Sequence, residues 1–196
     1  MELFEAITTR RSIGKVKEDQ VPLPLIEKVL EAATWAPNHH RTEPWRFVVL
    51  QDDGRQGLGR VYAEIALEKD SMLTDEERDS IYEKQMAKAF RAPVIIAVIV
   101  TPGDQANVIK QEEVAAGNAA VQNMLLAAHA LGLGAIWRTG KPAYHNKMKS
   151  FFGCQEKDEI VGLIYLGYSD LKVVPPPRIS FREKTIWVSE DHKSIR

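Results

Sequence analysis

The feature that most constrains the fold is an apolar run in the middle of the chain, Val94-Ile95-Ile96-Ala97-Val98-Ile99-Val100, which follows Pro93. Most of its residues are β-branched, and apolar residues occupy consecutive positions instead of alternating with polar ones. This pattern predicts a strand that is buried on both of its faces. A chain of 196 residues is long enough to form the core that such a strand requires.

Other segments predict the remaining elements. Further strands are expected at 46–50, 135–140 and 160–167, with a final edge strand at 186–188. Apolar periodicity and capping signals predict helices at 2–9, 25–34, 55–69, 74–90, 108–131 and 143–152. Unequal numbers of helices separate the strands, which favours an α+β architecture of about four to five strands against several helices. Without repeats or low-complexity linkers, residues 1–196 are expected to form a single domain.

The charge balance gives no reason to expect a nucleic-acid or membrane partner, because Lys and Arg total 26, Asp and Glu total 27, and the net charge is −1. The N-terminal residues lack the basic and apolar segments of a signal peptide, and the apolar runs are too short or too broken by charge to span a bilayer. The single cysteine, Cys154, cannot form an intrachain disulfide and is expected to be structural. These features predict a cytoplasmic protein.

The centre of the longest predicted helix, Ala115-Ala116-Gly117-Asn118-Ala119-Ala120, carries small side chains on every face. Such a helix permits another surface to approach closely. Two interpretations remain open: a partner helix or flat ligand packs there, or the small residues serve tight packing within the chain.

Two prolines enclose a polar loop between a predicted helix and strand, running from Ala36-Pro37 through Pro44-Trp45. It is either a simple polar connection or a binding loop, since loops between rigid elements often carry binding residues. Its adjacent histidines, His39 and His40, are expected to point apart. No metal-binding spacing accompanies them, so no metal site is expected, and a histidine hydrogen bond to a ligand edge is the better hypothesis.

The stretch Arg10-Arg11-Ser12 offers two guanidinium groups and a hydroxyl at the end of a helix. Arginine forms bidentate hydrogen bonds to phosphate, so these residues suit a phosphate group, although two surface arginines are also common. The chain has no glycine-rich dinucleotide motif, P-loop or nucleophile elbow. Trp35 and Trp137 lie in or beside polar loops and can stack on a planar ligand, whereas Trp45 is expected to pack in the core.

Three stretches together resemble the nitroreductase family of flavin enzymes. The first is Arg10-Arg11-Ser12 after a short helix; the second runs from Ala36-Pro37 through Pro44-Trp45-Arg46-Phe47-Val48-Val49, similar to the family pattern A-P-S-x-x-N-x-Q-P-W-x-F-V-V. The third is the long Ala/Gly helix leading through Gly132-Leu133-Gly134-Ala135 into Trp137-Arg138-Thr139-Gly140, with Gly162–Tyr168 and a proline-rich arm behind it. Order and spacing match over nearly the whole chain. Within the family, the Ala-Pro-Asn-His and Ile-Trp-Arg-Thr-Gly versions of these motifs resemble those of the small YdjA-type members.

The resemblance implies a nitroreductase-like fold, with a mostly antiparallel sheet flanked by helices. It also implies an intertwined homodimer that binds flavin mononucleotide (FMN) between its subunits. NADH or NADPH would deliver hydride, and a nitroaromatic, quinone or similar small-molecule acceptor would then enter the same pocket, in a ping-pong mechanism. Residues 69–91 would form a helical excursion over the pocket, and residues 170–196 a C-terminal arm. Since the cofactor carries the hydride and solvent can supply protons, no catalytic side chain is expected.

By position in the family motifs, Arg10, Arg11 and Ser12 are expected to hold the FMN phosphate and ribityl chain. Arg178, after the proline run, is a further candidate for the phosphate. The remaining expected cofactor-binding residues divide into two groups, Trp35 and His39 toward the flavin of the partner subunit, and Trp137, Arg138 and Thr139 along the isoalloxazine ring.

The chain departs from the family pattern at several of these positions. Asn38 replaces the usual Ser, Arg41 and Glu43 replace the usual Asn and Gln, and Gly14 stands where a basic residue is common. Two alternatives therefore stay open beside an FMN-dependent NAD(P)H nitroreductase. One is a non-enzymatic flavin-binding or regulatory module of the same fold. The other is a related flavin enzyme with a different reaction, such as dehalogenation or flavin fragmentation.

Overall fold

The fold is built on a four-stranded antiparallel sheet with the order β1-β2-β4-β3. The computed structural model describes residues 1–68, 72–171 and 173–189. The strands are β1 (Trp45–Gln51), β2 (Val94–Val100), β3 (Leu133–Arg138) and β4 (Glu159–Tyr168). These results confirm the predicted α+β class and the predicted number of strands.

Strand β2 lies inside the sheet, between β1 and β4, and all seven of its residues are buried. Successive side chains of a strand point to opposite faces. Accordingly, Ile96, Val98 and Val100 join one hydrophobic cluster, whereas Ile95 and Ile99 join a second one. The prediction of a strand buried on both faces is confirmed.

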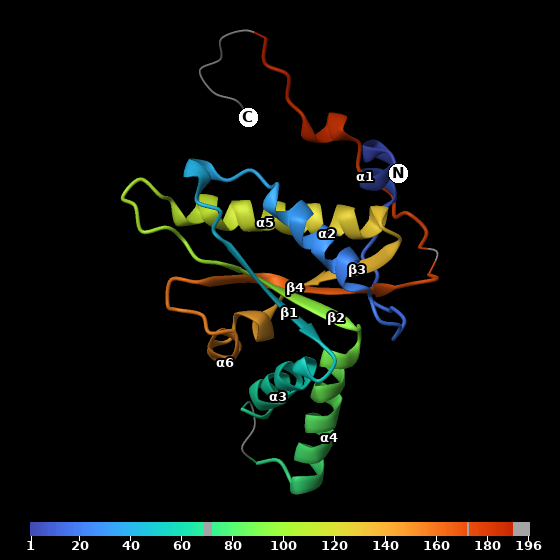
Figure 1. The fold of residues 1–196 in the computed structure, drawn as a ribbon, viewed down its shortest axis with the longest axis vertical. Helices are drawn as coiled ribbons and strands as arrows, with labels where there is room; N and C mark the ends of the chain where they lie inside the picture. The colour runs from blue at the N-terminus through green and yellow to red at the C-terminus, as the bar shows by residue number, and fades with distance from the viewer. Residues whose placement is uncertain (69–71, 172, 190–196) are drawn as a thin grey trace.

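Helices cover both faces of the sheet (Figure 1). On one side lie α2 (Leu23–Thr34) and α5 (Lys110–Ala130), and on the other lie α3 (Gly54–Leu67), α4 (Asp75–Met86) and α6 (Asn146–Phe151). The short helix α1 (Leu3–Thr9) contacts α5. Single-turn 3₁₀ helices complete the described structure: η1 (His39–Arg41), η2 (Ala87–Phe90), η3 (Lys141–Tyr144) and η4 (Phe181–Lys184). Within these ranges, no helix has both the length and the apolar character to cross a bilayer.

Local sequence signals predicted the ends of most helices and strands to within a few residues of their observed positions. Helix α4 begins at the predicted capping box, in which the Thr74 hydroxyl accepts a hydrogen bond from the Glu77 amide and the Glu77 carboxylate accepts one from the Thr74 amide. Helix α5 ends at Ala130, and Gly132, just beyond its C-cap Leu131, has a φ of +78° that suits glycine. The brief helix predicted at 143–152 consists of two pieces, η3 and α6.

The edge strand predicted at 186–188 is wrong, because this segment forms no strand. Ile186 and Trp187 are exposed, by 62% and 82%. Their strand-forming character has no effect without a neighbouring sheet edge. The proline run leads this part of the chain away from the sheet, past α1 (Figure 1). Residues 69–71, 172 and 190–196, which belong to the predicted excursion and arm, lie outside the described residues.

Tight packing within the chain explains the small residues on the side of α5 that faces the sheet. Gly117 of α5 faces the sheet, and a Cβ atom there would overlap the side chain of Val100 and come within 2.9 Å of Val161 Cγ2. Ala116 and Ala120 are also buried. By contrast, Ala115 and Asn118 are exposed, so the opposite side of α5 is open to another surface.

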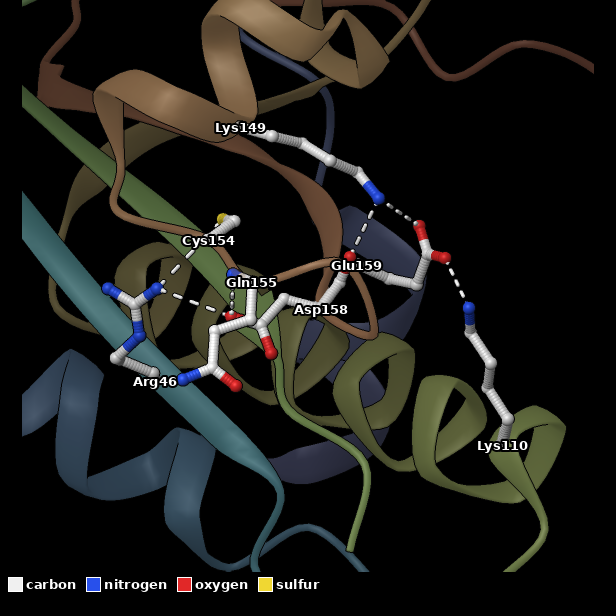
Figure 2. Close-up of polar contacts among 7 residues, drawn as sticks. All are labelled: Arg46, Lys110, Lys149, Cys154, Gln155, Asp158 and Glu159. Atoms are coloured by element: carbon white, nitrogen blue, oxygen red, sulfur yellow. Dashed lines mark hydrogen bonds and ion pairs between the residues drawn. The ribbon is translucent and has the colours of Figure 1, made fainter.

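A network of polar contacts ties the start of β4 to its neighbours (Figure 2). Lys149 of α6 donates to the backbone oxygen of Asp158 over 2.8 Å, and the Glu159 carboxylate contacts both Lys149 and Lys110, the latter over 2.5 Å. The buried Asp158 accepts a hydrogen bond from the Gln155 amide. These contacts join α5, α6 and β4, which fixes the end of the sheet where β3 also ends.

Cys154 lies at the edge of this network, 3.9 Å from Nη2 of Arg46 (Figure 2). Burial raises the pKa of its thiol above the ordinary value, and this effect exceeds the opposing effect of the Arg46 charge. A protonated thiol is a poor nucleophile. The environment of Cys154 therefore agrees with the structural role expected from the sequence.

Replacing Gly117 with alanine tests the close approach of α5 to the sheet. Alanine favours a helix interior by about 1 kcal/mol over glycine, but overpacking against Val100 costs about 1–3 kcal/mol. We expect Gly117→Ala to lower the free energy of unfolding, measured by urea denaturation. Gly54→Ala is the matched control, since a Cβ at Gly54 meets nothing within 4 Å. A Gly117→Ala protein as stable as the control would contradict this packing.

Candidate functional site

Three arginines and a histidine gather where α1 meets the C-terminal end of α5. The pKa of Arg10 is lowered by partial burial and then by the positive charges of Arg11 and Arg178, so the structure brings these three predicted residues together. The pKa of His129 is also lowered, first by burial and then by Arg10 and Arg11. Thr9 Oγ1 lies 2.8 Å from His129 Nε2. We call these residues, Arg10, Arg11, His129 and Arg178, the basic cluster.

Local contacts hold Arg11 within this cluster. Its Nη1 donates to the backbone oxygen of Thr8 over 2.8 Å and to that of Arg10 over 2.6 Å. Its Nε atom is buried and has no hydrogen-bond partner among the described residues. An unsatisfied guanidinium nitrogen beside other cations is a suitable donor for an anion.

The segment after the basic cluster follows the outer edge of β3. Ser12 forms a parallel bridge with Ala135, and the Ile13 amide donates to the Ala135 oxygen over 2.9 Å. At Gly14 the segment passes beside Arg138, because a Cβ atom there would be in ordinary contact with Nη2 of Arg138 at 3.7 Å. The predicted residues Ser12 and Arg138 are therefore linked along one strand edge.

A cavity of about 360 Å³ lies at the end of this edge, and all three predicted residues of β3 and its turn, Trp137, Arg138 and Thr139, line it. We call it the β3 cavity. The guanidinium of Arg138 lies over the ring of Tyr165, 5.0 Å from its centroid. The Arg138 Nε atom is buried and unpartnered among the described residues. A planar, electron-rich group in this cavity would meet an oriented cation.

Sequence reasoning missed four polar residues of the β3 cavity. These are Tyr62, Lys88, Arg91 and Tyr165. The two tyrosine hydroxyls lie 3.2 Å apart, and burial raises the pKa of both, so both are protonated at neutral pH. The four residues come from α3, η2, the turn after η2 and β4. No spacing along the chain signals their meeting, although Tyr165 stands within the motif Gly162–Tyr168 on which the family resemblance partly rests.

The indole of Trp137 connects β3 to its neighbour and borders a second opening. Its Nε1 donates to the Val161 oxygen over 3.1 Å. On the α5 side, Trp137 also lines a cavity of about 790 Å³ with Val114 and Asn118. Trp137 thus stands between the β3 cavity and the exposed side of α5.

The polar loop lies at the other end of α5. Nδ1 of His39 is 2.6 Å from the Glu112 carboxylate, whereas Thr9 and His129 meet near the C-terminal end of the same helix. Glu112 and His129 are seventeen positions apart on α5, which corresponds to roughly 25 Å. Trp35, at the end of α2, is 80% exposed. The structure therefore does not place Trp35 and His39 beside the basic cluster of the same chain.

The expectation that the two adjacent histidines point apart is wrong. The rings of His39 and His40 are stacked, with centroids 3.9 Å apart and an angle of 17° between their planes. His40 has a φ of +57°, a left-handed conformation that turns its ring back over His39. Asn107 Nδ2 lies 3.2 Å from ring nitrogens of His40 and supports this arrangement.

A buried carboxylate and an asparagine shape the rest of this loop. Glu113, 1% exposed, accepts hydrogen bonds from the Thr42 hydroxyl over 2.7 Å and from the Gly103 amide over 3.2 Å. Asn38 accepts one from the Glu43 amide over 3.0 Å. Thus Asn38 closes the loop on itself. Throughout the described ranges, no cluster of histidine, cysteine and acidic residues has the geometry to hold a metal ion.

Comparison with known proteins agrees with this architecture. The model of the Nitroreductase family matches residues 7–168. The Escherichia coli protein named "Putative NAD(P)H nitroreductase YdjA" is 32% identical over 182 residues, which cover 90% of this chain and 96% of that protein.

Solved structures show the same fold. A nitroreductase-like family protein from Bacillus cereus superimposes with a TM-score of 0.82, at 26% identity and 97% coverage of both chains. A Desulfovibrio desulfuricans structure, described as a "putative nitroreductase in complex with FMN", gives a TM-score of 0.70 at 27% identity, covering 96% of this chain and 97% of that one. The match across residues 7–168 and the similarity to YdjA show that this chain belongs to the nitroreductase family.

Proposed function

We propose that the protein is an FMN-dependent oxidoreductase that transfers hydride from NADH or NADPH to nitroaromatic, quinone or related acceptors. One observation carries the proposal: the edge of β3 joins the basic cluster to a cavity lined by Trp137, Arg138 and Thr139. A ligand with an anionic tail and a planar ring could place its tail at the basic cluster and its ring in the β3 cavity. The similarity to YdjA, whose name includes NAD(P)H, and to a structure solved with FMN supports it.

The basic cluster fits the FMN phosphate. Burial lowers the pKa of Arg10, and the positive charges of Arg11 and Arg178 lower it further; a phosphate dianion would offset the repulsion among these charges. The buried Nε of Arg11 adds a donor without a partner among the described residues. Ser12 is exposed next to the cluster and can donate to the phosphate or the ribityl chain. Arginine forks match phosphate oxygens in geometry as well as in charge.

The β3 cavity fits the flavin ring. Bound FMN supplies a ring that accepts hydride from a reduced nicotinamide and passes it to a second substrate. The charges of Arg138, Arg91 and Lys88 favour the negative charge of the reduced ring. The backbone of Thr139, at the end of the edge strand, is the candidate donor to the ring.

The residues of the cavity bind and orient but do not act as nucleophiles or bases. Tyr62 and Tyr165 keep their protons, because burial raises the pKa of both hydroxyls. Their rings and the shared hydroxyl contact form a rigid wall under Arg138. Acceptor specificity then follows from shape and charge in the cavity rather than from a catalytic side chain.

A homodimer completes the proposed site. Leu3 and Phe4 of α1 are 63% and 80% exposed, and the arm exposes Phe181 and Trp187, which indicates surfaces that a partner covers. The exposed side of α5 carries small or polar residues, including Ala115 and Asn118, that permit close approach. In a two-fold interface, both subunits contribute the same surface patch, and residues at one end of the patch meet residues at the other end of the partner's patch.

Antiparallel pairing of two α5 helices would place the His39 end of one subunit beside the basic cluster of the other. Trp35 and His39 would then serve the partner's cofactor, which accounts for their distance from the basic cluster of their own chain. Residues 170–196 would form a C-terminal arm that packs against the partner subunit. Residues 69–91 would cover the pocket, and Lys88 and Arg91 of this segment line the β3 cavity.

Purified protein tests the proposed function. We expect it to be yellow, with the absorption bands at about 370 and 450 nm that are typical of bound flavin. It should lose the band at about 450 nm when NADH or NADPH is added without oxygen. A quinone or nitroaromatic should restore the band. Colourless protein that does not take up FMN would refute FMN dependence, and flavin that stays oxidised with both nucleotides would favour a flavin-binding module without enzymatic activity.

Replacement of Arg10 tests the phosphate site. We expect Arg10→Ala to weaken FMN binding by about 1–3 kcal/mol, measured by fluorescence titration of the apoprotein, because a charge-assisted hydrogen bond is lost. Riboflavin, which has no phosphate, should bind both proteins equally. Arg60→Ala, an exposed arginine on α3, is the matched control. Equal loss of FMN and riboflavin affinity would show that Arg10 does not contact the phosphate.

A further inference from the structure

A second cationic cavity lies next to the β3 cavity. It has a volume of about 550 Å³ and lies between the segment Gly14–Glu18 and the residues before β2. Among the described residues that line it, four carry positive charge and one carries negative charge. These are Lys15, Lys17, Arg55 and Arg91, with Glu18 as the acid. We call it the lysine cavity.

Three contacts hold Arg55 in place at the wall of the lysine cavity. Arg55 donates through Nη1 to the Ala92 oxygen over 2.7 Å and through Nε to the Asp52 oxygen over 3.1 Å. Its guanidinium also lies over the ring of Phe90, 4.9 Å from the centroid. These contacts fix the charge of Arg55 at the wall of the cavity.

The lysine cavity and the β3 cavity share Arg91. The charge of Arg91 lowers the pKa of both Tyr62 and Tyr165 against the larger effect of burial, so Arg91 acts within the β3 cavity as well. A ligand whose ring enters one cavity can therefore extend its other end into the second.

The lysine cavity is separate from the basic cluster. Arg11, Ile13 and His129 line a different cavity, of about 330 Å³, on the other side of the N-terminal segment. Between the two, the Lys17 amide donates to the Tyr168 oxygen over 2.7 Å, and Val16 packs against the core on the α3 side. The proposed FMN phosphate site has its own cations, so Lys15 and Arg91 of the lysine cavity are not required for it, whereas Lys17 is paired with Asp170 over 2.6 Å and would be shared with a bound anion.

We propose that the lysine cavity binds the phosphate groups of the nicotinamide nucleotide, while its nicotinamide ring lies against the flavin ring that the proposed function places in the β3 cavity. This inference rests on the proposed function. Nitroaromatic and quinone acceptors need not carry charge, but NADH carries a pyrophosphate and NADPH a further phosphate. The nucleotide is thus the ligand of the proposed reaction that requires a second cationic site. Because NADPH carries more negative charge, the cavity favours NADPH over NADH.

Calorimetric titration of the FMN-loaded protein tests this assignment. The probes are NADP⁺, NAD⁺ and nicotinamide mononucleotide, and the variants are Lys15→Gln and the Lys15→Gln/Lys17→Gln double variant. The single variant retains the ion pair between Lys17 and Asp170, so it guards against a structural effect. Lys28→Gln, an exposed lysine on α2, is the matched control for charge.

We expect the double variant to weaken NADP⁺ binding by about fivefold or more, with a smaller loss in the single variant, as two exposed lysine contacts of this kind predict. The affinity for NAD⁺ should fall less than that for NADP⁺, and Lys28→Gln should bind all three probes with wild-type affinity. Nicotinamide mononucleotide, which carries a single phosphate, should lose the least affinity. Unchanged affinity of the double variant for NADP⁺ and NAD⁺ would overturn the proposal.

An acceptor series separates the nucleotide from an acidic acceptor as the occupant. The pair is para-nitrobenzoate, which carries a carboxylate, and nitrobenzene, which is neutral. If the double variant needs more para-nitrobenzoate to reach half-maximal rate, with nitrobenzene and NADP⁺ affinity unchanged, the cavity serves the acceptor and the proposal is wrong. Failure of the wild-type protein to bind FMN would instead refute the proposed function, so the two failures are distinguishable.

Discussion

The burial of β2 on both faces is the constraint on which the rest of the structure depends. Its seven apolar residues require one layer of helices above the sheet and another below it, and the two hydrophobic clusters supply them. Burial of this apolar surface stabilises the fold in proportion to its area. Helix α5 can close the upper layer because Gly117 permits contact with Val100 and Val161. In the strand order β1-β2-β4-β3, strand β3 lies at an edge of the sheet.

The position of β3 determines where the candidate site forms. An edge strand has free backbone groups, and Ser12 and Ile13 occupy part of them. That pairing brings the basic cluster alongside β3, at whose end Trp137, Arg138 and Thr139 open into the cavity. The same N-terminal segment then separates the basic cluster from the lysine cavity. Binding residues from distant parts of the sequence are thus organised around one strand edge.

The fold was largely predictable because its elements carry local signals. The apolar run of β2, the capping box at Thr74 and the glycine at 132 each depend on neighbouring residues alone. The segment 186–188 has strand-forming residues too, but a strand also needs a partner edge, which local sequence cannot show. The stacking of His39 on His40 likewise depends on a left-handed backbone at His40 that neither residue type demands. The candidate site was predictable only in part: Arg10–Ser12 and Trp137–Thr139 stand in contiguous motifs, whereas Lys88 and Arg91 follow a polar helix, where charged residues are ordinary. Motifs therefore indicated part of the candidate site, whereas the residues that line its walls come together only through tertiary packing.

We propose that each flavin site combines the basic cluster of one subunit with Trp35 and His39 of the other. A heterodimer of an Arg10→Ala subunit and a Trp35→Ala/His39→Ala subunit, purified through two different tags, tests it directly by FMN titration. A composite site predicts that each variant homodimer binds FMN weakly, whereas the heterodimer has one intact site and binds one FMN with wild-type affinity. If each site belongs to a single subunit, every site of the heterodimer carries a defect, and the resulting absence of high-affinity binding would contradict a composite site.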